Sequence, residues 1–164
     1  MSQTKTRWLS QSEQRLWRAY LEGTQRLWET LSRELDQDGT LPLTEYEVLV
    51  RLSEAPDRRL RMSELADLLS HSRSRLTHTV TRMQRRGLVH REPHGTDGRG
   101  VVARATDTGL AMLEQAAPTH VTGVREHLFD QMTPDEAEVV ARVLGRVTDH
   151  LRQVREQDRE TLGA

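Results

Sequence analysis

The chain contains 164 residues, of which 35% are hydrophobic and 30% are charged, and its formal net charge is −1. This length suits one domain, and the absence of cysteine excludes disulfides, thiolate metal sites and cysteine-based redox sensing. No apolar run approaches the length of a membrane span, and residues 1–8 lack the apolar stretch of a secretory signal. We therefore expect a soluble protein of the cytoplasm.

The net charge is near zero, but the middle of the chain is basic. Residues 58–104 contain 11 arginines and four acidic residues, a net charge of +7, which leaves −8 for the rest of the chain. A basic segment between acidic flanks favours a polyanionic partner that binds only at that segment.

A long helix is predicted from Ser10 to Gly39. Ser10 and Glu13 have the spacing of a capping box, in which each side chain bonds to the backbone N–H of the other residue. Apolar and aromatic residues then recur at helical spacing from Trp17 to Leu35. Gly39 ends the helix, because glycine adopts the left-handed conformation of a helix C-terminus without steric cost.

The middle of the chain predicts shorter elements. Thr44 and Glu47 form a second capping-box pattern, which opens a helix that continues to about Ala55. The elements that follow are a short helix over 62–69, a tight connection at 70–71, a helix from Ser72 to Gly87, and strands over 88–93 and 101–105 joined by the turn HGTDGRG. This order predicts a winged helix-turn-helix.

Two long helices close the chain. Thr106 caps the first, and Thr133, Pro134 and Glu136 open the second with an N-cap, a proline at the first helical position and a capping-box acid. Their apolar stripes are Leu110, Leu113, Ala117, Val121, Val124 and Leu128 in the first helix, and Val140, Leu144, Val147, Leu151 and Val154 in the second.

These stripes exceed what so small a centre can bury, so we expect the outer helices to pack on one another and on a second subunit. The predicted fold class is mostly α with a small β-wing. A winged helix-turn-helix over residues 44–106 lies between an N-terminal dimerisation helix, residues 1–43, and C-terminal dimerisation helices, residues 107–164.

The helix that Ser72 caps has an exterior suited to DNA. Leu76, Val80 and Met83 form its buried stripe. The residues that then face outward or flank the stripe are Arg73, Ser74, Arg75, Thr77, His78, Thr81, Arg82 and Arg85. This set contains no acid, and arginine in the major groove can bind guanine O6 and N7 together, while the helix N-terminus at Ser72 suits a phosphate. The alternative is a basic surface helix without a partner.

The turn HGTDGRG strengthens this interpretation. Arg99 lies near the hairpin tip, from which a long cation can reach the electronegative minor groove. Asp97 could pair with Arg99 and hold it extended. Asp97 and Arg99 are therefore predicted to bind DNA together with the helix.

The sequence resembles the MarR family of bacterial transcriptional regulators, of an actinobacterial type. The resemblance is carried by LRMSELADLL (60–69), SRSRLTHTVTRMQRRGLVHREP (72–93), TDGRG (96–100) and ATDTGLAMLE (105–114). It implies one domain over about residues 8–156, with residues 72–82 as the recognition helix. It also implies a homodimer that binds a pseudo-palindromic operator, usually as a repressor, in the cytoplasm and at the nucleoid when bound. Release by a small aromatic or phenolic ligand is a further implication; peroxide sensing through cysteine is excluded.

Three aromatic residues, Trp17, Tyr20 and Tyr46, are candidates for a ligand pocket, although aromatic residues at helical spacing more often only pack. Arg15 and Arg18 could supply the counter-charge for an anionic aromatic acid. The spacing of the histidines predicts no metal site, and we expect no cofactor.

Two other classes of function, an enzyme and a protein–protein interaction module, make different demands on the sequence. An enzyme would need a nucleophile–base constellation, which the sequence does not contain, so we expect none. A winged-helix module for protein–protein interaction, without sequence-specific DNA binding, remains the alternative function. It would expect apolar residues on the recognition face, where this chain has arginine, serine and threonine.

Overall fold

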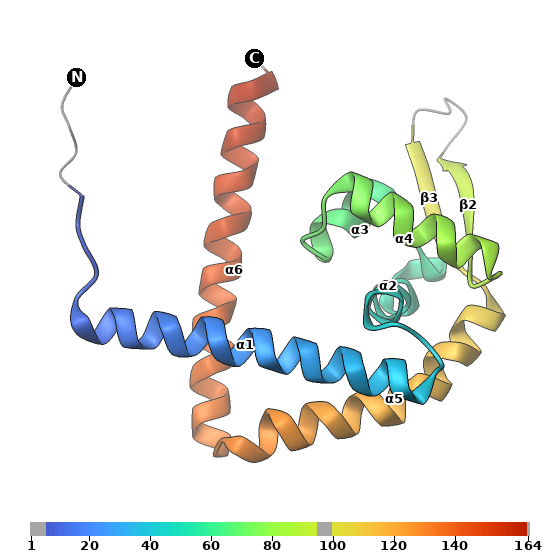
Figure 1. The fold of residues 1–164 in the computed structure, drawn as a ribbon. Coiled ribbons are helices and arrows are strands. Elements are labelled where there is room, and N and C mark those ends of the chain that lie inside the picture. Colours follow the sequence, from blue (N-terminus) through green and yellow to red (C-terminus); the bar gives the residue numbers. More distant parts are fainter. Residues whose placement is uncertain (1–5, 95–99, 164) are drawn as a thin grey trace. The chain divides into compact units, whose positions relative to one another are not determined.

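The computed structural model describes residues 6–94 and 100–163. The elements, in chain order, are α1 (Gln11–Asp38), α2 (Leu43–Glu54), the 3-10 turn η1 (Pro56–Arg58), β1 (Arg59–Arg61), α3 (Met62–Leu68), α4 (Arg73–Arg85), β2 (Val89–His94), β3 (Gly100–Ala105), α5 (Asp107–His127), η2 (Phe129–Gln131) and α6 (Pro134–Gly163) (Figure 1). The chain divides into two compact units, residues 1–123 and 124–164. The described fold is mostly helical with a small antiparallel sheet, which confirms the predicted fold class.

The ends of α1 form as predicted. Ser10 Oγ accepts a hydrogen bond from Glu13 N at 3.3 Å, and Ser10 N donates to Glu13 Oε2 at 2.7 Å. Gly39 ends the helix with a φ of 74°, in the left-handed region that favours glycine.

The predicted capping box at the start of α2 is wrong. The helix begins at Leu43, directly after Pro42, and no side chain caps it. The carbonyl of Pro42 accepts from both Glu45 N and Tyr46 N, which places Thr44 and Glu47 inside the helix. Leu43, the first residue of the helix, is 5% exposed and so belongs to the core.

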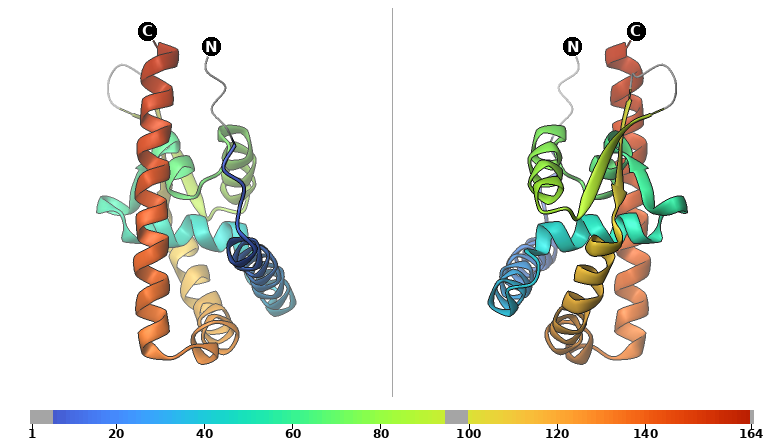
Figure 2. Two further views of the ribbon diagram at one scale, coloured as in Figure 1. Left: turned by 90° about the vertical axis from the view of Figure 1, so that its left-hand side faces the viewer. Right: turned by 90° about the vertical axis from the view of Figure 1, so that its right-hand side faces the viewer.

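The sheet has one strand more than the sequence pattern predicts. The strand order is β1-β3-β2, and all pairs are antiparallel. In β1, for which no element was predicted, Leu60 pairs with Ala103. A three-residue strand is too short to show an alternating pattern, so only its partner β3 reveals it. The right-hand view of Figure 2 shows β2 and β3 side by side, with β3 leading into α5.

The core of the first unit lies where α2, α3, α4 and the sheet meet. Its fully buried side chains include Leu49, Leu52, Leu65, Leu76, Val80, Met83 and Val89. In Figure 1, α3 and α4 lie across α2, and the contacts between these three helices agree with that view. The core therefore holds α4 from one side only.

The helix α5 buries a different face from the predicted stripe. Its buried residues are Gly109, Ala116 and Gly123, spaced seven apart, whereas the predicted stripe is half-buried except at Val121, which is 53% exposed. A Cβ on Gly123 would lie 2.3 Å from Glu34 Oε2 in α1, so the two helices approach closely through a residue without a side chain. A pattern of large apolar residues does not reveal a helix face that is buried through glycine and alanine.

In the second unit, α6 starts with the predicted capping box. Thr133 Oγ accepts from Glu136 N at 3.3 Å, and Thr133 N donates to Glu136 Oε2 at 2.8 Å. The predicted apolar stripe of α6 is exposed, from 37% at Val154 to 54% at Leu151. Among the residues that the structure describes, no helix is long and apolar enough to cross a membrane.

Candidate nucleic-acid interface

The connection between α3 and α4 is as tight as predicted. Ser70 takes a φ of 53°, in the left-handed region, and His71 N donates to the carbonyl of Ala66 at 2.9 Å. Ser72 then caps α4, because its Oγ accepts from Arg75 N at 3.3 Å. Two helices joined in this way, followed by the β2–β3 hairpin, form a winged helix-turn-helix.

The buried stripe of α4 is confirmed. Leu76, Val80 and Met83 are each 0% exposed, and Thr79 beside them is 6% exposed. The hydroxyl of Thr79 donates to the carbonyl of Arg75 at 3.2 Å, which satisfies this buried polar group inside its own helix. The stripe orients α4, so its opposite face is presented to the outside.

That opposite face is polar and basic. Arg73, Ser74, Thr77, His78 and Arg85 are exposed, and Thr81 is half-buried. The helix contains no acidic residue, so its arginines have no carboxylate within α4. An exposed helical face of this kind can donate hydrogen bonds to phosphates and to base edges.

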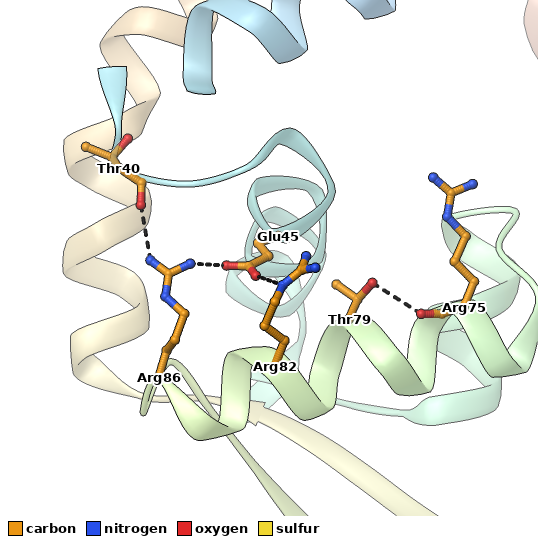
Figure 3. A network of polar contacts seen from close by, with 6 residues as sticks. All are labelled: Thr40, Glu45, Arg75, Thr79, Arg82 and Arg86. Atoms are coloured by element: carbon orange, nitrogen blue, oxygen red, sulfur yellow. Dashed lines mark hydrogen bonds and ion pairs between the residues drawn. The ribbon is translucent and has the colours of Figure 1, made fainter. Parts of the chain in front are cut away.

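Three arginines share one side of α4. Arg75, Arg82 and Arg86 are spaced seven and four residues apart, which brings them to the same flank at 3.6 residues per turn. The carboxylate of Glu45, in α2, accepts from Arg82 Nε and from Arg86 Nη1 (Figure 3). Arg82, which the sequence predicted only as an outward DNA contact, is therefore also part of an internal ion pair.

Glu45 was not among the predicted site residues. It is the only described acidic residue in the buried class, with 0% exposure. A signal was present, because Glu45 shares the helical stripe of Val48, Leu49 and Leu52. An acid on an otherwise apolar stripe needs a cationic partner, although the sequence does not say which one.

The predicted wing residues Asp97 and Arg99 lie outside the described residues. The strands on either side are described, and the last pair before the turn is His94 with Gly100.

The predicted ligand-binding residues lie in separate places. Tyr46 is 7% exposed and packs against the ring of His120, with 4.4 Å between ring centroids. Trp17 and Tyr20 stack at 6.0 Å on α1, where both are about half exposed. Arg15 and Arg18 are exposed on the same helix.

A cavity of about 790 Å³ lies elsewhere, between α1, α2 and the helix-turn-helix. Its lining residues are Trp28, Glu29, Ser32, Arg33, Asp36, Gln37, Leu43, Thr44, Glu47, Leu69, His71 and Arg75, which include none of the five predicted ligand residues. Burial lowers the pKa of His71, with a smaller effect from Arg75, and so favours its uncharged form. Burial raises the pKa of Glu47, against the opposing charges of Arg75 and Arg51.

The fold and this surface define a winged helix-turn-helix protein. A family model described as MarR family matches residues 40–100. The chain is 40% identical to AbsC, a MarR family transcriptional regulator from Streptomyces coelicolor, over 90% of this chain and 99% of AbsC, with a TM-score of 0.82. The chain belongs to the MarR family of transcriptional regulators, whose members are not enzymes.

Two further relatives are a regulator solved with DNA and a transcriptional repressor. Sco3205, a MarR family transcriptional regulator from the same organism, was solved in complex with DNA; it is 40% identical over 90% of this chain and 92% of its own, with a TM-score of 0.84. YetL, an HTH-type transcriptional repressor of Bacillus subtilis, is 27% identical over 106 residues, which are 65% of this chain and 63% of YetL.

Proposed function

We propose that this protein is a homodimeric repressor that binds a pseudo-palindromic operator through α4 in the major groove. The observation that carries the proposal is the exposed, acid-free face of α4, held outward by a fully buried stripe. The proposed contacts are Ser72, Arg73, Ser74, Arg75, Thr77, His78, Thr81 and Arg82, with Asp97 and Arg99 in the wing. The DNA complex of Sco3205 supports this assignment.

The dimer is supported by apolar surface that one chain leaves uncovered. In α1, Leu16 is 71% exposed and Trp17 52%, and in α6 Leu144 is 42% exposed and Val147 47%. Contiguous apolar rows of this kind mark interaction surfaces. A two-fold dimer would present two copies of α4 about one helical turn apart on DNA, roughly 34–36 Å, as an operator with two half-sites requires.

The proposed effector is a small aromatic or phenolic compound that releases the operator. The cavity beside α4 supports it through the aromatic face of Trp28, and the charged part of the lining combines Arg33 and Arg75 with Glu29, Asp36 and Glu47. A compound bound there could release DNA only by as much as it prefers the non-binding arrangement of the helices. The aromatic residues Trp17, Tyr20 and Tyr46 with Arg15 and Arg18 remain the other proposed site.

Fluorescence anisotropy with the DNA upstream of the protein's own gene, beside a scrambled duplex of the same composition, tests this function. We expect the upstream DNA to bind at least about a thousandfold more tightly than the scrambled duplex at physiological salt. Equal binding to both would remove sequence-specific recognition. No binding to either would favour the protein–protein interaction module instead.

A further inference from the structure

A buried carboxylate connects α2 to the recognition helix. Glu45 lies in the first turn of α2 with no exposed surface, and its two oxygens accept from Arg82 in α4 and from Arg86 at the C-cap of α4, each at 2.5 Å (Figure 3). A buried carboxylate is strongly unfavourable without a cationic partner. One arginine would be enough to neutralise Glu45, so the presence of a second calls for another explanation.

The two arginines use their nitrogen atoms differently. Arg86 is bound at both ends, because Nη1 donates to Glu45 and Nη2 donates to the carbonyl of Thr40 at 3.3 Å. Arg82 is bound to Glu45 only through Nε. Its terminal nitrogens form no hydrogen bond with any described residue, and its side chain is 55% exposed. Figure 3 shows these nitrogens on the side of the guanidinium away from the bond to Glu45.

The position of Arg82 on α4 indicates what it would bind. Ser74, His78 and Arg85 lie opposite the buried stripe, whereas Arg82 lies on the flank toward α2. When a helix enters the major groove, its outermost residues meet base edges and its flanks meet the phosphates that border the groove. A guanidinium at this place suits a phosphate oxygen.

We infer that Glu45 is a positioning residue for DNA binding, which holds Arg82 by Nε so that its terminal nitrogens face a phosphate of the operator. Arg86, which the same carboxylate and Thr40 hold, stabilises the fold and does not contact DNA. This inference rests on the proposed function.

Positioning of this kind has a physical benefit. A free arginine loses rotamer freedom when it binds a phosphate, and this loss weakens binding. In this protein the ion pair with Glu45 already restricts Arg82 before DNA arrives. Glu45 is itself inaccessible to DNA, so its effect on binding has to pass through Arg82.

The matched pair of arginines permits a sharp experiment. The intact dimer and its Arg82→Gln, Arg86→Gln, Glu45→Gln and Glu45→Gln/Arg82→Gln variants are titrated with the operator between 50 and 200 mM salt, alongside thermal melting. Each phosphate contact adds about 0.9 to the slope of log K against log salt. We expect Arg82→Gln to reduce the magnitude of the slope by roughly 1.8 per dimer. Arg86→Gln should lower the melting temperature and leave the slope unchanged.

Glu45→Gln supplies the decisive comparison. It should weaken operator binding by roughly two- to tenfold per subunit, the range expected from immobilising one long side chain. It should have no further effect on binding in the Arg82→Gln background. The same loss in both backgrounds, or equal slope changes for Arg82→Gln and Arg86→Gln, would overturn the inference and leave Glu45 a structural residue.

One further variant avoids any change to Glu45. Arg82→Lys keeps the positive charge, but a lysine ammonium bound to Glu45 has no second set of nitrogens that could bind a phosphate. We therefore expect Arg82→Lys to reduce the slope of log K against log salt as Arg82→Gln does. Wild-type slope and affinity in Arg82→Lys would also overturn the inference. If the unaltered protein binds no operator in a salt-dependent manner, the proposed function itself fails. A failure of the inference alone leaves wild-type binding intact.

Discussion

Gly109 lies against the backbone of Leu88 so closely that a Cβ atom would stand 2.2 Å from the Leu88 carbonyl oxygen. The same oxygen accepts from Thr106 N and from Thr106 Oγ, each at 3.1 Å. Thr106 Oγ also accepts from Gly109 N at 2.9 Å, which caps α5. The start of α5 is therefore joined directly to the residue that leads into β2.

Gly109→Ala should destabilise the protein by about 1–3 kcal/mol, because the new methyl group meets backbone that cannot move without disturbing β2. Thermal melting measures the loss. Gly23→Ala is the matched control, since Gly23 is also helical but has nothing within 4 Å of the added Cβ. The control should be neutral or stabilising by up to about 1 kcal/mol. Equal effects of the two variants would show that the contact with Leu88 does not matter.

Stability should fall with acid in part because of His120. Burial lowers the pKa of His120 below its usual 6.5, against the opposing charge of Glu34, and its Nδ1 has no hydrogen-bond partner among the described residues. The unfolded chain therefore takes up a proton near pH 6.5 while the folded chain does not, so stability falls as the pH drops through 6.5 toward the lower folded pKa.

His120→Gln should remove part of this acid sensitivity, measured as the difference in melting temperature between pH 7.5 and pH 5.5. His71 has a pKa lowered by burial in the same direction, so some sensitivity should remain. His150→Gln, at an exposed position of α6, is the control and should melt like the unaltered protein at both pH values. A full wild-type difference in His120→Gln would contradict the prediction.

Leu144→Glu should separate the proposed dimer, because it puts a charge in the centre of the apolar row of α6. Light scattering at micromolar concentration should give half the mass of the unaltered protein, and operator binding should be lost with it. Arg142→Glu also changes charge on α6 but lies on the opposite face, so it should remain dimeric. A monomeric unaltered protein would end the two-half-site proposal.

Arg75→Ala should weaken operator binding by roughly 1–3 kcal/mol and relax the preference at one base pair per half-site, if Arg75 binds a guanine. Binding to a panel of single-substituted operators measures this preference. Equal losses on operator and scrambled DNA would instead assign Arg75 to a phosphate. Arg75 shares the flank of α4 with Arg82, for which we infer a phosphate contact, so this comparison decides whether the two arginines bind DNA in the same way.

Salicylate should distinguish the two proposed effector sites through tryptophan fluorescence. If it binds in the cavity, Trp28→Phe should abolish the quenching that accompanies operator release, while Trp17→Phe should keep it. The reverse pattern would favour the exposed surface of α1, where Trp17 stacks on Tyr20. An unchanged complex at every salicylate concentration would remove this class of effector.

Much of the fold follows from rules that act within a few residues. The capping boxes at Ser10 and Thr133, the cap at Ser72 and the left-handed Gly39 each depend on neighbours in the chain, which is why the sequence predicts them. The buried stripe of α4 follows from helical periodicity in the same way. The sequence by itself therefore determined the helix-turn-helix and the face that it presents.

Contacts between distant segments were decided only by the tertiary structure. Glu45 meets Arg82 and Arg86 across separations of 37 and 41 residues, and no local pattern selects these partners. The strand β1 exists because β3 pairs with it. Gly109 is buried because a backbone carbonyl occupies the space of its missing side chain, a fit that depends on the packing of whole elements rather than on the hydrophobicity of one residue.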